Sequence, residues 1–217
     1  HFRVACMKVI STNISRPTTI QWNGTDRITG IYKKPQAGGI YFSADGVRDD
    51  TIGNPKVHGG TQKAAYLYPK DQYPFWKAQY PHLKWEYGMF GENLTVEGMD
   101  EGFLRMGDLF QIGEARVRIT TPREPCFKLG IRFSDQGIIQ KFVDHGYPGS
   151  YVAVLEPGWV RPGDNMVLIE AASDQISIAE FFKLWYAAQK DPKLIAMALQ
   201  NPWLAENKRR RLKQWLE

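Results

Sequence analysis

The clearest indication of the fold is the stretch DLFQIGEARVRITT, residues 108–121. It contains two runs rich in β-branched and aromatic residues, and Gly113-Glu114 separates them by the gap of a hairpin turn. Similar short runs, divided by Gly, Pro, Asn and Asp, extend from residue 7 to about residue 171. This pattern predicts a β-rich domain, built as a barrel or a sandwich and not as a doubly wound parallel sheet.

The segment after residue 172 contains three signals for the start of a helix. Ser177 and Glu180 have the spacing of a capping box, in which each side chain accepts a hydrogen bond from the other residue's backbone N–H. Two further pairs combine an N-cap residue with proline at the first helical position: Asp191-Pro192 and Asn201-Pro202. Apolar residues recur at three- to four-residue spacing, so these helices are expected to form a small bundle.

The fold class is therefore expected to be mainly β with peripheral α. Residues 7–172 form the β-domain, with internal helices near Pro69 and after Ser134, and residues 173–217 form a small C-terminal three-helix domain. Residues 1–6 are interpreted as a leader or as a remnant of the expression vector.

Composition and charge narrow the class of protein. The 217 residues carry a net charge of +5 and contain only two cysteines, too few for a disulfide framework. The sequence has no signal-peptide core and no apolar run of membrane length, so we expect a cytoplasmic protein without a membrane partner. The densest basic run, KRRRLK at 208–213, is interpreted as a solvated helix face and not as a nucleic-acid site.

The first candidate site is NPKVHGGTQKA, residues 54–64. Successive backbone N–H groups at Gly59 and Gly60 can form an anion-binding nest. Basic side chains that could surround a phosphate there are Lys56, His58 and Lys63. The alternative is a tight hairpin whose lysines are merely solvated.

The second candidate is FGENLTVEGM, residues 90–99. A turn entering a strand would place Asn93 where it can donate to a ligand, and Glu92 where it can orient a nearby lysine or arginine. Taken alone, the motif favours a plain loop with local hydrogen bonds between side chains and backbone.

The third candidate is TPREPCFKLG, residues 121–130, whose two prolines favour a defined, extended backbone. Cys126 lies between Arg123 and Lys128, and two nearby cations favour the thiolate form that ligates metals or attacks electrophiles. The alternatives are a buried structural cysteine or a Cys126–His58 nucleophile pair. The histidines are too scattered for a zinc site.

Four motifs, KVHGG, GENLT, MGDLFQIG and PREPCFKL, occur in this order at separations that resemble the MOSC family of molybdenum cofactor-binding domains. Together with the C-terminal helices, they resemble the YiiM-type members over nearly the whole chain. The resemblance implies a β-barrel with peripheral helices. It also implies that Cys126 is the metal ligand and catalytic residue, binding molybdenum beside the two dithiolene sulfurs of the molybdopterin.

The resemblance further implies a cofactor-binding set around the phosphate and pterin of Mo-molybdopterin. Its members in this sequence are Lys56, His58, Gly59, Gly60, Lys63, Asn93, Arg123 and Lys128. The residues after the glycine pair depart from the family pattern, because a lysine stands where an arginine is usual. A lysine cannot make the bidentate contact that an arginine makes with phosphate, so the role of Lys63 is the one put in doubt.

The activity that the resemblance implies is the reduction of N-hydroxylated compounds, such as 6-N-hydroxylaminopurine, to the amine. Electrons would come from an external donor protein, such as a flavin or an iron–sulfur reductase. The C-terminal helices with their basic run are expected either to dock an acidic donor or to help cover the pocket. The chain is expected to act as a monomer or a homodimer. Two alternatives remain open: a non-catalytic carrier of molybdenum cofactor or persulfide sulfur on Cys126, and a cofactor-free thiol enzyme.

Overall fold

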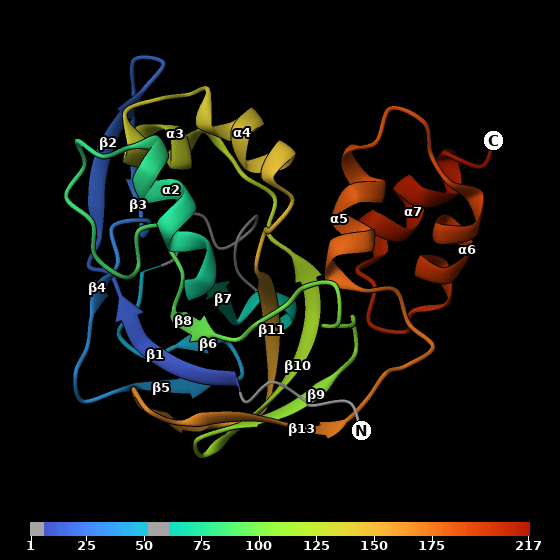
Figure 1. Cartoon of the computed structure of the whole chain (residues 1–217), viewed down its shortest axis with the longest axis horizontal. Helices are drawn as coiled ribbons and strands as arrows, with labels where there is room; N and C mark the ends of the chain where they lie inside the picture. Colours follow the sequence, from blue (N-terminus) through green and yellow to red (C-terminus); the bar gives the residue numbers. More distant parts are fainter. Residues whose placement is uncertain (1–6, 52–60) are drawn as a thin grey trace.

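A closed, seven-stranded β-barrel forms the centre of the molecule (Figure 1). The computed structural model describes residues 7–51 and 61–217. The strands follow one another around the barrel as β13 (Asn165–Glu170), β9 (Leu109–Ile112), β10 (Ala115–Pro122), β11 (Ser150–Glu156), β7 (Ala65–Pro69), β8 (Leu94–Glu97) and β1 (Met7–Ile14). Antiparallel pairing of β1 with β13 closes the ring, and only β7 and β8 run parallel. The predicted mainly β fold is confirmed.

The hairpin predicted from the opening stretch is formed by β9 and β10. Ala115 pairs with Ile112, and Gly113-Glu114 makes the turn between them. Gly113 has a φ of +55°. A Cβ atom there would lie 2.3 Å from Asp164 Oδ2 and 2.7 Å from Trp159 O. Both the backbone conformation and the space therefore require glycine at this turn.

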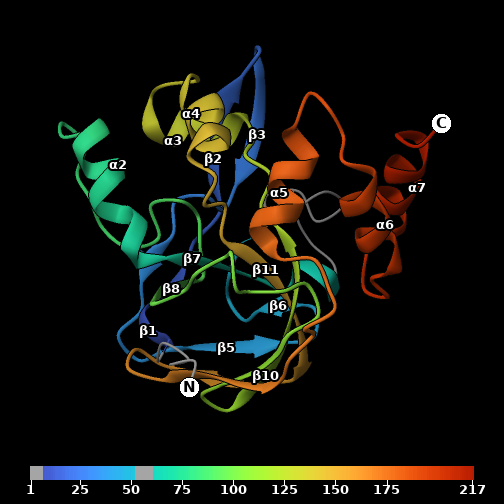
Figure 2. The same cartoon turned by 45° about the vertical axis from the view of Figure 1, so that its right-hand side comes forward.

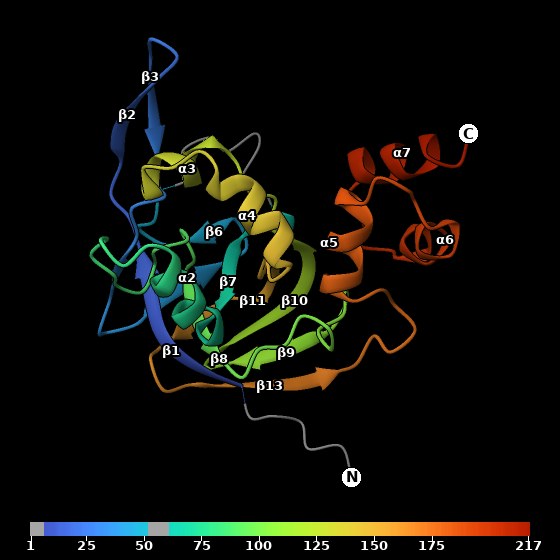
Figure 3. The same cartoon turned by 45° about the horizontal axis from the view of Figure 1, so that its top comes forward.

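Three helices cover one end of the barrel (Figure 3). They are α2 (Tyr73–Gln79), α3 (Phe127–Phe133) and α4 (Ile138–His145). The helices expected near Pro69 and after Ser134 correspond to α2 and α4, whereas α3, directly after Cys126, was not predicted. Buried aromatic rings hold these helices on the barrel, with Phe90 stacked on Tyr68 at 4.2 Å and Trp76 donating a hydrogen bond to the Tyr68 hydroxyl at 2.8 Å.

Several short strands lie outside the closed ring of the barrel. β4 (Lys34–Pro35) pairs with β1, and a small sheet contains β12 (Gly158–Val160), β5 (Ile40–Ser43) and β6 (Gly46–Val47). A separate hairpin of β2 (Thr18–Trp22) and β3 (Thr25–Thr29) projects beside α3 (Figures 1 and 3). Trp22 on this hairpin stacks on Phe127 at 4.6 Å.

The C-terminal segment contains α5 (Ile178–Tyr186), α6 (Pro192–Gln200) and α7 (Glu206–Gln214), grouped at one side of the barrel (Figure 2). The capping box of Ser177 with Glu180 and the N-cap at Asp191 are confirmed. No helix in the described part of the chain is long and apolar enough to cross a membrane.

The predicted helix start at Asn201-Pro202 is wrong. Asn201 ends α6, its side-chain oxygen accepts a hydrogen bond from Trp203 N at 2.9 Å, and α7 begins only at Glu206. The Asn201 amide also donates to Met106 O at 2.8 Å. The asparagine therefore stabilises a turn and joins it to the barrel, because both halves of its amide are used outside a helix.

The C-terminal helices share a continuous apolar core with the barrel. Phe181, Ile195 and Leu212 belong to the same buried cluster as the barrel residues Phe110 and Ile119. Backbone hydrogen bonds reinforce this contact: Ile178 N donates to Leu104 O at 2.8 Å, and Met106 N donates to Ile176 O at 3.0 Å. The helices are thus packed as part of the main core.

A buried carboxyl lies where α5 meets the barrel. Glu101 is fully buried, and its Oε1 accepts a hydrogen bond from Gly149 N at 3.0 Å, while its Oε2 has no partner among the described residues. Burial raises the pKa of Glu101 to about 7. Because an ionised carboxylate here has lost water and gained little in return, the protonated form is favoured in the folded chain.

We expect this carboxyl to lower stability as the pH rises. The folded pKa of about 7 exceeds the ordinary value of 4.5, so the folded chain holds a proton that the unfolded chain has lost between these values. The free energy of unfolding should fall across that window by up to about 3 kcal/mol. Urea denaturation between pH 4.5 and 8 measures this free energy. The fall should be absent from the Glu101→Gln protein and present in the exposed control, Glu156→Gln.

Candidate functional site

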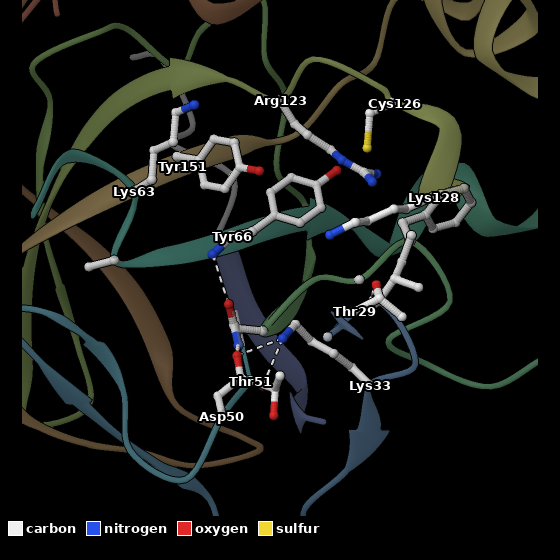
Figure 4. A pocket seen from close by; sticks show the side chains of 16 residues that line it. Thr29, Lys33, Asp50, Thr51, Lys63, Tyr66, Arg123, Cys126, Lys128 and Tyr151 are labelled. Carbon is white, nitrogen blue, oxygen red and sulfur yellow. Dashed lines mark hydrogen bonds and ion pairs between the residues drawn. The ribbon is translucent and has the colours of Figure 1, made fainter. Parts of the chain in front are cut away.

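A pocket opens at the end of the barrel where β10 passes into α3 (Figure 4). It gathers side chains that lie far apart in the sequence. Its polar lining, among the described residues, consists of Thr29, Lys33, Asp50, Thr51, Lys63, Tyr66, Asn93, Arg123, Cys126, Lys128 and Tyr151. The pocket thus contains all five predicted site residues that the structure describes.

Cys126 occupies the N-cap position of α3. Its backbone is extended, with φ −137° and ψ 172°, and its carbonyl accepts a hydrogen bond from Leu129 N at 2.9 Å. The side chain is partly exposed, and its sulfur points toward the Arg123 guanidinium (Figure 4). The extended backbone expected for this segment, whose two prolines precede the cysteine, is present at Cys126 and directs the thiol to the pocket.

Arg123 is almost fully buried, with 6% of its surface exposed. Its guanidinium lies over the rings of Tyr66 and Phe142, with Cζ 5.2 Å and 5.7 Å from their centroids. Its Nη1 has no hydrogen-bond partner among the described residues. A buried guanidinium nitrogen without a partner is costly, and an anion bound in the pocket would satisfy it.

The pocket carries a surplus of positive charge. Four basic side chains, Lys33, Lys63, Arg123 and Lys128, face a single carboxylate, Asp50, among the described lining residues. Burial lowers the pKa of Lys128, and the nearby Cys126 opposes this shift. Burial also lowers the pKa of Lys63. This balance favours an anionic ligand.

One wall of the pocket is a buried polar network around Asp50. Its carboxylate accepts hydrogen bonds from Lys33 Nζ at 2.6 Å and from Asn93 Nδ2 at 2.8 Å. Asn93 Nδ2 also donates to Asn13 O at 3.2 Å, and Asn93 Oδ1 accepts from Tyr66 N at 3.1 Å. The Asn93 side chain, which was expected to contact a ligand, therefore has protein partners for both its oxygen and its nitrogen, and it stabilises this wall of the pocket.

The sequence suggested that Glu92 orients a nearby lysine or arginine, but its hydrogen-bond partners are of another kind. It is fully buried, and its carboxylate accepts hydrogen bonds from the Tyr73 hydroxyl, from Gly88 N at 2.9 Å, from Phe90 N at 3.1 Å and from Thr95 Oγ1 at 2.8 Å. Four donors around one buried carboxylate stabilise the turn before β8, so its role is structural.

Four predicted site residues, Lys56, His58, Gly59 and Gly60, lie outside the described residues. Conversely, the structure adds side chains that the sequence did not identify: Lys33, Asp50, Tyr66 and Tyr151. The only sequence signal for Lys33 is its place in the lysine pair before Pro35, which does not indicate that one lysine turns inward. The tyrosines belong to ordinary strand patterns.

The described residues do not by themselves supply a full set of metal ligands at this pocket. Within residues 7–51 and 61–217, no group of three or more His, Cys, Asp or Glu side chains could hold a metal ion. His145 is engaged elsewhere, 2.8 Å from Gln72 Oε1 and stacked on Phe75. One thiol beside an unpartnered guanidinium nitrogen and surplus lysines fits an anionic cofactor that carries its own metal ligands.

The sequence model of the MOSC domain matches residues 54–167, which include β7 to β11 and the Cys126 segment. The chain belongs to the MOSC family. This confirms the family predicted from the four sequence motifs. The matched region supplies Lys63, Asn93, Arg123, Cys126 and Lys128, so the pocket lies mainly within the MOSC domain.

This MOSC chain is similar to several known proteins. It is 34% identical to the uncharacterised protein YflK of Bacillus subtilis, over 92% of this chain and 90% of YflK. It is 30% identical to YiiM of Escherichia coli, over 87% of each chain. It is also 30% identical to a Gibberella moniliformis protein named "Reductase", over 82% of this chain but 32% of that protein.

The crystal structure of YiiM from Geobacillus stearothermophilus superposes with a TM-score of 0.81. The superposition covers 97% of this MOSC chain and 100% of that chain, at 27% sequence identity. The similarity therefore includes the C-terminal helices as well as the barrel.

Substitution of Asp50 should strongly destabilise the MOSC domain. Asp50→Asn leaves the Lys33 ammonium buried without a counter-charge, and we expect a loss of about 3 kcal/mol or more in the free energy of unfolding. Urea denaturation of the wild type and the variant measures this difference in the free energy of unfolding. The matched control is Glu156→Gln, which removes an exposed ion pair with Arg116 and should cost less than about 1 kcal/mol. Equal effects of the two substitutions would contradict the importance of the buried pair.

Proposed function

We propose that the chain binds the molybdenum cofactor through Cys126 and reduces N-hydroxylated compounds, such as 6-N-hydroxylaminopurine, to the corresponding amines. The observation that carries the proposal is the Cys126 thiol beside Arg123, whose buried Nη1 has no partner in a pocket with surplus positive charge. MOSC domains are associated with this cofactor, and one relative carries the name "Reductase".

Different residues of the pocket would bind different parts of such a cofactor. Cys126 would ligate the metal, while Arg123 and Lys63 would bind the phosphate and the polar edge of the pterin. Asp50 and Lys33 neutralise each other, so they position the wall of the pocket and would contribute little net charge to binding. When bound, the cofactor supplies two-electron redox chemistry.

The reaction consumes two electrons and two protons: the N–O bond breaks, the nitrogen becomes an amine, and the oxygen leaves as water. Lys128 would donate a proton from its Nζ; its place in the pocket lining beside Cys126 and the lowering of its pKa by burial support this role. The Tyr66 hydroxyl donates to Pro148 O at 2.7 Å, and burial raises the pKa of Tyr66, so this phenol stays neutral beside Arg123.

Electrons would come from an external flavin or iron–sulfur protein. The basic C-terminal helix is the proposed docking surface, but only part of the run 208–213 is available for it. Lys208 is buried, and Arg209 donates hydrogen bonds to Leu199 O and, at 2.7 Å, to Asn201 O. The exposed cations of the run are Arg210, Arg211 and Lys213. An acidic donor would meet these three.

The first test is the cofactor content of the protein. Wild-type protein from a host that makes molybdenum cofactor should contain close to one molybdenum and one pterin per chain, by metal analysis and pterin fluorescence. Cys126→Ala should lose most of the molybdenum, because the proposed protein ligand of the metal is removed. Cys6→Ser is the matched control and should keep it. Wild-type protein without either component would overturn the proposal.

The second test is turnover. Loaded protein should reduce 6-N-hydroxylaminopurine with dithionite as the electron source, and Lys128→Met should lower kcat by about 100-fold, as expected for loss of a general acid. Lys84→Met, in a loop outside the pocket, is the control. Loaded protein that cannot reduce the substrate would favour the alternative function, a carrier of cofactor or persulfide sulfur.

A further inference from the structure

Tyr151 and Tyr66 form a cross-strand pair in the wall of the pocket. The antiparallel register of β11 and β7 places them directly opposite each other, and their ring centroids lie 5.3 Å apart. Both residues line the pocket (Figure 4). Two tyrosines thus lie side by side in one site, and their hydroxyl groups can be compared directly.

The hydroxyl of Tyr66 is already used by the protein. Tyr66 is 4% exposed, and its hydroxyl donates a hydrogen bond to Pro148 O at 2.7 Å. This bond satisfies the buried phenol within the fold, so the role of the Tyr66 hydroxyl is structural.

The hydroxyl of Tyr151 has no such partner. No hydrogen bond joins it to any residue in the described part of the chain. The side chain is partly exposed at the pocket, and its hydroxyl points toward the side on which Tyr66 and Arg123 lie (Figure 4). A ligand in the pocket can therefore reach this hydroxyl.

The packing of Tyr151 does not require a hydroxyl group. Its ring contacts the Tyr66 ring, and Lys63 Nζ lies 5.4 Å from its centroid. A phenylalanine would make both contacts, because each of them depends on the aromatic ring alone. The oxygen is therefore the part of the Tyr151 side chain that the fold leaves unused.

The Tyr151 hydroxyl keeps its proton, so it is a hydrogen-bond donor. Burial raises the pKa of Tyr151, and the opposing effect of Arg123 is smaller. Basic side chains outnumber acidic ones in the described lining of the pocket, which favours an anion there. A neutral phenol can donate a hydrogen bond to such an anion, whereas a phenolate would repel it.

We propose that Tyr151 is an anion-binding residue, whose hydroxyl donates a hydrogen bond to a phosphate oxygen of the ligand in the pocket. Arg123 also contacts the Tyr66 ring, with Cζ 5.2 Å from its centroid, and its Nη1 likewise has no partner among the described residues. A guanidinium and a phenol with unused donors therefore lie beside the same ring. The inference rests on the proposed function, in which the pocket binds the phosphate of a cofactor, and it adds a contact to that ligand.

The test is phosphate binding by the full chain, purified from a host that makes no molybdenum cofactor, with inorganic phosphate as the probe. Calorimetric titration should show that Tyr151→Phe binds phosphate about 10-fold more weakly than the wild type, as expected for the loss of one hydrogen bond to a charged group. Tyr147→Phe removes an exposed phenol outside the pocket and should bind phosphate as the wild type does. A Tyr151→Phe protein with wild-type affinity would overturn the inference.

Urea unfolding separates a binding role of the Tyr151 hydroxyl from a structural one. Tyr151→Phe should unfold at the wild-type urea concentration, whereas Tyr66→Phe should unfold at a lower one because it loses its bond to Pro148 O. A Tyr151→Phe protein that unfolds as early as Tyr66→Phe would contradict the inference and indicate a structural hydroxyl. Wild-type protein that binds no phosphate would also overturn it, while the molybdenum and pterin content of protein from a cofactor-making host decides the proposed function separately.

Discussion

The buried carboxylate of Asp50 is the interaction on which the candidate site depends. It accepts hydrogen bonds from Lys33, from Asn93 and from the backbone and hydroxyl of Ser15, at 2.8 Å and 3.2 Å for the last two. These groups come from segments that are far apart in the sequence. Because a buried charge is tolerated only when it is paired and hydrogen-bonded, the carboxylate obliges these segments to meet in one arrangement. That arrangement forms one wall of the pocket.

The pairing also decides the electrostatic character of the site. Asp50 and Lys33 neutralise each other, so basic side chains outnumber acidic ones among the described residues that line the pocket. In a partly buried pocket these charges act through a medium less polar than water, so their attraction for an anion is strengthened. Glu124, beside the pocket in the sequence, forms an ion pair with Lys208 of α7. The surplus of positive charge in the pocket is therefore a property of several segments together.

The C-terminal helices are integrated with the barrel in both apolar and polar respects. Leu212 and Phe181 extend the barrel core, while Asn201 and Lys208 bind Met106 O and Glu124 across the boundary. A run that is uniformly basic in the sequence thus has two roles in the structure. Its first two cations bind within the protein, and the remaining three face solvent. In a helix, residues three or four positions apart share a face and residues one or two positions apart point in different directions, which a linear run of charges conceals.

The sequence by itself determined the β-rich class, the hairpin at Gly113, the capping box at Ser177 and the position of Cys126 between two cations, because turns, caps and strand patterns depend on residues close together in the chain. Only the tertiary structure decided which polar groups became pocket lining and which became scaffold. Asn93 lines the pocket and its amide also hydrogen-bonds to the protein on both sides, whereas Lys33 and Asp50, without any local signal, meet inside the protein. Asn201 ends a helix that it was expected to begin, because its amide finds partners on both sides of the boundary with the barrel. These outcomes depend on long-range contacts and desolvation, which the order of residues alone does not specify.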